Sequence, residues 1–86
     1  MNIKFKDKAL EQLSKLPKGV QRRILGKLKF FVSTNKPLQF AHFIKDKKLG
    51  GYRFRIGDYR AVFDANDGEI EILKIGHRKD IYKVSS

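Results

Sequence analysis

We expect this chain of 86 residues to fold as one α+β domain, in which two helices pack on one face of an antiparallel sheet. Three observations predict this class. Apolar side chains in residues 7–33 repeat at the spacing of helices. Those in residues 52–76 follow the two-residue period of strands, in runs that turn signals separate. The chain is also too short for more than one modest core, so we place a single domain at residues 1–86.

The N-terminal part predicts a short strand followed by a helix. Residues 2–6 alternate apolar side chains with polar neighbours, which is typical of a strand. Asp7 stands where the N-cap of a helix is expected, and Pro17 ends this helix because proline cannot continue it. The apolar positions of the helix are Leu10, Leu13 and Leu16.

A second helix is predicted from about Pro17 to Ser33, and it should form an antiparallel hairpin with the first. Its apolar side chains make the one-sided stripe of a helix that packs on a core. The stripe consists of Val20, Ile24, Leu28 and Phe31, with Leu25 and Val32 beside it. The basic side chains off the stripe should face solvent; they are Arg22, Arg23, Lys27 and Lys29.

The second half of the chain predicts three strands after an irregular connection. Residues 33–48 have no sustained period and can include a turn of helix, and we interpret His42 there as a half-buried structural side chain. Gly57-Asp58 and residues 66–68 are turn signals between runs rich in aromatic and β-branched residues. These runs should form an antiparallel meander, which makes a single sheet with the first strand.

The turn at Gly57-Asp58 decides which side chains share a face of the sheet. With a two-residue loop, Arg55 pairs with Arg60, and strand side chains alternate between the two faces. The core face then consists of Tyr52, Phe54, Ile56, Tyr59, Ala61 and Phe63. The opposite face carries Arg53, Arg55 and Arg60. A three-residue loop would instead turn Arg60 toward the core.

Three guanidinium groups on one small face favour a phosphate-binding site. Like charges opposite each other across strands oppose folding by up to about 1 kcal/mol. A cluster of guanidiniums is nevertheless a ready site for phosphate, because each one can form charge-assisted hydrogen bonds with the phosphate oxygens. The alternative is a solvated strand face without a ligand, on which the long side chains splay into water.

The C-terminal stretch "IGHRKDIY" brings an imidazole, a guanidinium and a phenol together in the sequence. His77 and Arg78 follow a glycine at the end of the last strand, which could bring them to the rim of the arginine face. Tyr82 reaches this rim if the segment folds back. Alone, His77 would be a surface residue and Tyr82 a packing aromatic, but beside three arginines a catalytic role is an equal alternative.

The net charge of +11 favours a polyanion as partner. The excess is uneven, since residues 1–43 carry a net +8 and residues 44–86 a net +3. Nucleic acid or a ribonucleoprotein is the most common partner for a field of this sign. The alternatives are a basic protein without such a partner and one that an acidic protein masks.

Composition and motifs disfavour several other classes of site. The chain has no cysteine for disulfides or thiolate metal sites, and its two histidines without a carboxylate at ligand spacing do not make a metal site. It has no phosphate loop, dinucleotide fingerprint or serine elbow, so we expect no cofactor. No apolar run has the length of a signal peptide or a membrane span, so we expect a soluble, cytoplasmic protein without a membrane partner.

Two stretches, taken in order, resemble a known family. "YRFRIGDYRAVF" (Tyr52–Phe63) and "IEILKIGHRKDIY" (Ile70–Tyr82) resemble the signature half of the RelE/ParE toxin superfamily, above all its RelE-like branch. A weaker similarity runs through the helices in "LSKLPKGVQRRI" (Leu13–Ile24). The resemblance implies a RelE-like fold and the toxin of a type II toxin–antitoxin pair.

The resemblance also implies an activity and its partners. RelE-like toxins enter the ribosomal A site and cut messenger RNA during translation, and an antitoxin neutralises them by wrapping their surface. We therefore expect a ribosome-dependent endoribonuclease whose partners are the ribosome, mRNA and a cognate antitoxin, which should be acidic and fold on binding. The alternatives are a ParE-like toxin that poisons DNA gyrase without cleaving RNA, and a basic binding module that has lost its toxicity.

Individual residues match positions that matter in the family. Family members have basic residues at the positions of Arg53 and Arg55, arginines at those of Arg60 and Arg78, and a C-terminal tyrosine at that of Tyr82. The best-known branch has lysines on the second strand of the signature, where this chain has arginines. Because arginine keeps its proton in proteins, the proton acceptor must come from the C-terminal stretch, from the RNA or from the ribosome.

For attack of the 2′-hydroxyl on its own phosphate, the predicted catalytic residues are Arg60, Arg78, His77 and Tyr82. The guanidiniums would balance the extra negative charge of the phosphorane, and the imidazole or phenol would move protons. Because this set lacks the paired histidines of a self-sufficient ribonuclease, we expect slow or absent cutting of free RNA. The predicted RNA-binding residues are Arg53, Arg55, Lys48, Lys79, Arg22, Arg23, Lys27 and Lys29.

Overall fold

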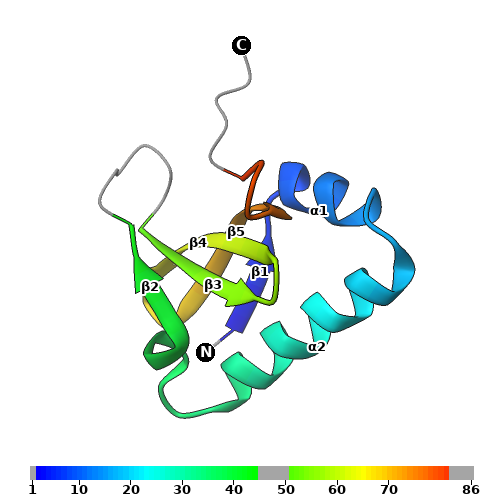
Figure 1. Ribbon diagram of the computed structural model, residues 1–86. Helices are drawn as coiled ribbons and strands as arrows, with labels where there is room; N and C mark the ends of the chain where they lie inside the picture. Colours follow the sequence, from blue (N-terminus) through cyan, green and yellow to red (C-terminus); the bar gives the residue numbers. More distant parts are fainter. Residues whose placement is uncertain (1, 45–50, 82–86) are drawn as a thin grey trace.

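The computed structural model describes residues 2–44 and 51–81, in which two helices cover one face of a five-stranded sheet (Figure 1). The strands are β1 (Asn2–Phe5), β2 (Ala41–Phe43), β3 (Tyr52–Ile56), β4 (Tyr59–Asn66) and β5 (Glu69–His77). They lie in the order β1-β5-β4-β3-β2, with β1 parallel to β5 and the other pairs antiparallel. The predicted α+β class and the meander of β3, β4 and β5 are confirmed.

Strand β2 was expected to be part of an irregular connection. A 3-10 helix at Pro37–Phe40 leads directly into β2, which pairs with β3 and becomes an edge of the sheet. Three residues are too few to show a two-residue period, so the sequence alone does not indicate this strand. His42 lies exposed on β2, and the expectation that it is a half-buried structural side chain is therefore wrong.

Helix α1 (Asp7–Ser14) packs against β5. Asp7 is the first helical residue rather than the N-cap, and Lys6 takes the cap position without a side-chain hydrogen bond. An acidic residue in the first turn is favoured by the helix dipole, which explains why the helix tolerates Asp7 there. The small Ala9 is fully buried against the sheet, while Leu10, which we expected on the apolar face, is 48% exposed.

Helix α2 (Lys18–Ser33) packs on β3 and on the 3-10 helix. The predicted stripe is confirmed, because Ile24, Leu28 and Phe31 are buried. The ring of Phe31 stacks on that of Phe54 in β3, with 4.5 Å between the centroids. Neither helix of the described residues is long and apolar enough to cross a membrane. The basic side chains of α2 are exposed, as predicted; they are Arg22, Arg23, Lys27 and Lys29.

The hairpin of β3 and β4 has the two-residue loop that we expected at Gly57-Asp58. The glycine of this loop has φ +60°, a left-handed conformation that glycine adopts without strain. The ladder then pairs Arg55 with Arg60, and Phe54 with Ala61. Phe54 and Ala61 are fully buried in the core beneath the helices. The predicted register is therefore confirmed, and the arginines point away from the helices.

Candidate nucleic-acid interface

Five basic side chains gather on the face of the sheet that the helices leave open. Two come from β3, one from β4, and two from the turn that follows β5. They line a single hollow of about 330 Å³, which we call the basic hollow and which consists of Arg53, Arg55, Arg60, Arg78 and Lys79. The structure thus brings together the arginines of both signature stretches, although the two stretches are separate in the sequence.

Arg60 is held against the turn of its own hairpin. Its Nη1 atom donates hydrogen bonds to the backbone carbonyls of Gly57 and Tyr59, both at 2.8 Å. These bonds restrict the orientation of the guanidinium. Less side-chain entropy is therefore lost when the group binds a phosphate than would be lost by a freely rotating side chain.

Arg78 is tied to the same turn from the other side. Its backbone N–H donates to the carbonyl of Asp58 at 2.7 Å, and its Nε atom lies 3.4 Å from a carboxylate oxygen of Asp58. Both side chains are more than half exposed, so this ion pair contributes only about 0–1 kcal/mol to stability. Its main consequence is to keep the segment after β5 beside the basic hollow.

His42 joins the open face from β2, a position that the sequence alone does not predict. It lies directly opposite Arg53 in the β2–β3 ladder, and opposite residues of a ladder point to the same side of the sheet. The pKa of His42 is lowered, first by desolvation of the ring and then by the positive charges of Arg55, Arg53 and Arg60. Both causes disfavour the charged imidazolium and favour the neutral ring.

His77 lies on the opposite face, so the structure does not bring it to the arginines. The ladder pairs Phe63 with Ile72 but Val62 with Lys74, which leaves one extra residue in β5. Without this bulge, His77 would face the basic hollow, because one residue of register moves every following side chain to the other face.

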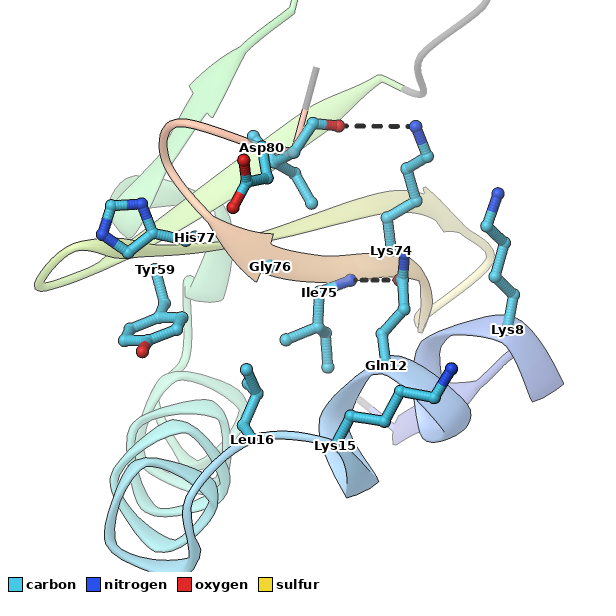
Figure 2. Close-up of a pocket in the computed structure, with 11 residues that line it drawn as sticks. Lys8, Gln12, Lys15, Leu16, Tyr59, Lys74, Ile75, Gly76, His77 and Asp80 are labelled. Atoms are coloured by element: carbon cyan, nitrogen blue, oxygen red, sulfur yellow. Dashed lines mark hydrogen bonds between the residues drawn. The ribbon is translucent and has the colours of Figure 1, made fainter. Parts of the chain in front are cut away.

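The ring of His77 instead contacts residues near the helical face. It meets the ring of Tyr59 edge to face, with centroids 5.5 Å apart, and its Nδ1 atom accepts the backbone N–H of Lys79 at 3.1 Å. His77 lines a second cavity, of about 530 Å³, between α1 and the end of β5 (Figure 2). In this cavity the side chain of Gln12 accepts a hydrogen bond from the backbone N–H of Ile75 at 2.9 Å. The pairing of β1 with β5 ends at Ile72, so β1 does not pair with Ile75.

Helix α2 presents basic side chains, of which Arg23 reaches the β3–β4 turn. Three of them line a separate hollow of about 390 Å³, which we call the α2 hollow and which consists of Arg22, Arg23, Gly26, Lys27 and Phe30. The guanidinium of Arg23 reaches the turn, since a Cβ atom on Gly57 would lie 2.7 Å from its Nη2 atom. The α2 hollow is therefore adjacent to the turn that holds Arg60 and Arg78.

Two predicted site residues, Lys48 and Tyr82, lie outside the described residues, and their roles stay predictions. Within residues 2–44 and 51–81, no group of three histidine or carboxylate side chains could hold a metal ion. On the open face, the described side chains offer two kinds of chemistry. Guanidinium and ammonium groups can bind anions, and the imidazole of His42 can move a proton.

A family of known proteins matches nearly the whole chain. Its description is "ParE toxin of type II toxin-antitoxin system, parDE", and the match covers residues 3–82. The chain belongs to this family. It is therefore the toxin of a type II toxin–antitoxin system, and the predicted membership of the RelE/ParE superfamily is confirmed.

Solved structures of other toxins have the same fold. The toxin–antitoxin complex RelBE2 from Mycobacterium tuberculosis matches with a TM-score of 0.74 and 24% identity, over 90% of this toxin and 96% of that chain. The archaeal RelE–RelB complex from Pyrococcus horikoshii matches with a TM-score of 0.70 and 28% identity, over 92% and 96%. The RelB–RelE complex from Methanococcus jannaschii matches with a TM-score of 0.67 and 25% identity, over 91% and 93%. The predicted RelE-like fold is confirmed. No curated protein sequence matches the toxin.

Proposed function

We propose that the toxin is a ribosome-dependent endoribonuclease that cleaves translated mRNA in the ribosomal A site. The observation that carries this proposal is the basic hollow, where four arginines from three separate segments converge. A phosphodiester matches this set, because guanidinium groups bind phosphate oxygens through paired, charge-assisted hydrogen bonds. The similarity to RelE toxins from Pyrococcus horikoshii and Methanococcus jannaschii supports the same branch of the superfamily.

Cleavage by the 2′-hydroxyl requires stabilisation of a phosphorane that carries extra negative charge. Arg60 and Arg78 suit this task, since contacts with the β3–β4 turn restrain both of them. Fixed guanidiniums aimed at developing charge stabilise the transition state without reorganisation during the reaction. Arg53 and Arg55 would position the RNA backbone on either side of the reacting phosphate.

The ribosome would supply the geometry of the substrate. His42 and His77 lie on opposite faces of the sheet, so the described residues do not form the paired histidines of a self-sufficient ribonuclease. Holding mRNA in an attack geometry can contribute much of the rate acceleration. Cutting of free RNA should accordingly be slow. The α2 hollow would bind phosphates of ribosomal RNA.

A cognate antitoxin would inhibit the toxin at the same surface. The relatives from Pyrococcus horikoshii and Methanococcus jannaschii are RelE–RelB complexes. With a net charge of +11, the toxin would attract an acidic antitoxin segment, which could fold as it binds. Carboxylates in the basic hollow would then exclude the phosphate of the message.

Two variants test the proposal. Arg60→Ala and Arg78→Ala are expressed without antitoxin, and the ends of cellular messages are mapped by primer extension. Each variant should cut translated mRNA at least about 10²-fold more slowly, since removing one group that stabilises the transition state costs about 10²–10³ in rate. Lys36→Ala is the matched control, because Lys36 is an exposed cation outside both hollows. Growth arrest and message cutting at the normal level by both arginine variants would contradict the proposal.

The second candidate function is a toxin that traps DNA gyrase and leaves RNA intact. The match to the family described as ParE toxins favours it. This function predicts DNA breaks and an induced damage response while messages stay whole. Primer extension and a gyrase cleavage assay on the same induced cells distinguish the two candidates.

A further inference from the structure

The proposed nuclease needs a group that accepts the proton of the 2′-hydroxyl. The arginines of the basic hollow cannot do so, because guanidinium groups keep their proton in proteins. The bulge in β5 turns His77 to the helical face, against Tyr59, and away from the hollow. Among the described residues, His42 is the imidazole on the open face.

His42 stands beside the two guanidiniums that would position the RNA backbone. It lies directly opposite Arg53, and the Cβ atoms of such pairs are about 4.5–5.5 Å apart. Arg55 is the diagonal neighbour two residues further along β3, at a typical separation of about 7–8 Å. An RNA backbone that Arg53 and Arg55 position beside the reacting phosphate would therefore pass within reach of the imidazole.

We propose that His42 is a catalytic residue that accepts the 2′-hydroxyl proton when this toxin cleaves RNA. The inference rests on the proposed ribonuclease function and assigns the residue that starts the reaction.

The charged groups around His42 prepare it to accept a proton. Desolvation of the ring, followed by the charges of Arg55 and Arg53 from β3 and of Arg60 from β4, lowers the pKa of His42 and so favours the neutral imidazole. Asp64 of β4 also lies on this face, where its carboxylate accepts the backbone N–H of Gly51 at 2.8 Å. A phosphodiester in the hollow would add a negative charge near the ring, which raises its basicity when the substrate is bound.

The reaction balances without a cofactor. The neutral ring nitrogen of His42 takes the proton of the 2′-hydroxyl, and the 2′ oxygen forms a bond with phosphorus. The bond between phosphorus and the 5′ oxygen of the next nucleotide breaks, and water protonates the departing oxygen. The imidazolium then returns its proton to water. The products are a 2′,3′-cyclic phosphate and a 5′-hydroxyl, with no net change in protons.

A pH profile of cleavage on ribosomes tests the assignment. The kcat/KM for a message in the A site is measured by single-turnover kinetics from pH 5 to 8.5 for wild type, His42→Gln and His77→Gln. The wild-type rate should fall on the acid side as the free imidazole of His42 becomes protonated. His42→Gln should be slower by about 10²-fold or more, which is the usual contribution of a general base, and should lose this acid limb. The same substitution at position 77 should retain the limb.

A binding measurement tests the placement without relying on activity. The ring of His42 is titrated by NMR in the free toxin, with and without sulfate, which remains a dianion through this range and stands in for a phosphate group. His42→Gln identifies the signal. The midpoint should lie below the ordinary value for histidine and should rise when sulfate occupies the basic hollow.

Four outcomes would count against the inference. If wild type cleaves but His42→Gln has the same rate and the same pH profile, His42 is not the base, while the nuclease function stands. If the acid limb of the pH profile is lost in His77→Gln instead, the base is on the helical face of the sheet and His42 is not the base. If wild type leaves messages whole on the ribosome, the nuclease function fails and this inference fails with it. A sulfate-insensitive midpoint would separately contradict the position of His42 beside the phosphate site.

Discussion

Two hydrogen bonds, one to a backbone carbonyl and one to a side chain, restrain the end of β5. The backbone N–H of Arg78 bonds to Asp58 in the β3–β4 turn, and the side chain of Gln12 accepts the N–H of Ile75 from α1 (Figure 2). The end of β5 carries Arg78 into the basic hollow, so both contacts affect the site. Residues without a functional signature in the sequence, such as Gln12 and Asp58, thus support the side chains of the basic hollow.

The contact of Gln12 should be measurable in the stability of the toxin. Gln12→Ala leaves the N–H of Ile75 without its partner in a partly buried place, and we expect a loss of about 1–3 kcal/mol in the free energy of unfolding. Urea denaturation followed by circular dichroism measures this loss. Gln39→Ala is the control, because Gln39 is exposed on the 3-10 helix. Equal stability of the two variants would show that the N–H finds water instead.

Among the elements, the β3–β4 hairpin places like charges opposite each other, which lowers its stability and concentrates positive charge at the basic hollow. Arg55 and Arg60 lie directly opposite each other, and like charges in that relation are destabilising. On β1, by contrast, Lys4 has its Nζ atom 3.1 Å from Glu69 and 3.6 Å from Glu71 of the neighbouring strand. The sheet thus pairs opposite charges at its β1 edge and like charges at the proposed site.

Arg55→Thr should separate stability from anion binding. Threonine suits a strand, and removing the like-charge pair should raise the free energy of unfolding by up to about 1 kcal/mol. Affinity for sulfate and for ribosomes should fall, because the basic hollow loses one guanidinium. Urea denaturation and isothermal titration with sulfate measure the two effects. Lys4→Thr is the matched control, and it should not stabilise the toxin, since Lys4 has two acidic neighbours. A less stable Arg55→Thr protein with unchanged sulfate affinity would contradict both expectations.

For the whole molecule, the net charge of +11 has opposite effects on folding and on binding. Like charges repel within the free toxin, and salt screens this repulsion. Salt also weakens contacts with RNA phosphates, because each contact releases counterions. A surface that attracts a polyanion therefore costs stability in the free protein.

Raising the concentration of potassium chloride should stabilise the free toxin and weaken the ribosome binding that we propose. The logarithm of the binding constant should fall linearly with the logarithm of salt concentration, by about 0.7–0.9 for each phosphate contact. Lys27→Ala in the α2 hollow should reduce the magnitude of this slope by about 0.7–0.9, which is the share of one phosphate contact. Thermal unfolding and ribosome sedimentation at several salt concentrations provide the measurements. A slope that Lys27→Ala leaves unchanged would place the docking surface elsewhere.

Local patterns determined much of this protein. The helical stripes, the α+β class and the two-residue loop at Gly57-Asp58 were readable from the sequence, because each depends on residues that are close together in the chain. The same loop placed Arg53, Arg55 and Arg60 on one face. The family resemblance added the toxin class, which the match to residues 3–82 confirms.

Only the tertiary structure decided which imidazole accompanies the arginines. The short strand β2 becomes recognisable when it pairs with β3, and this pairing places His42 opposite Arg53. A bulge in β5 moves the residues that follow it to the opposite face and places His77 against Tyr59, on the helical face. Both outcomes depend on pairing between strands that are distant in the chain, and a one-residue change in that pairing exchanges the two faces of a sheet.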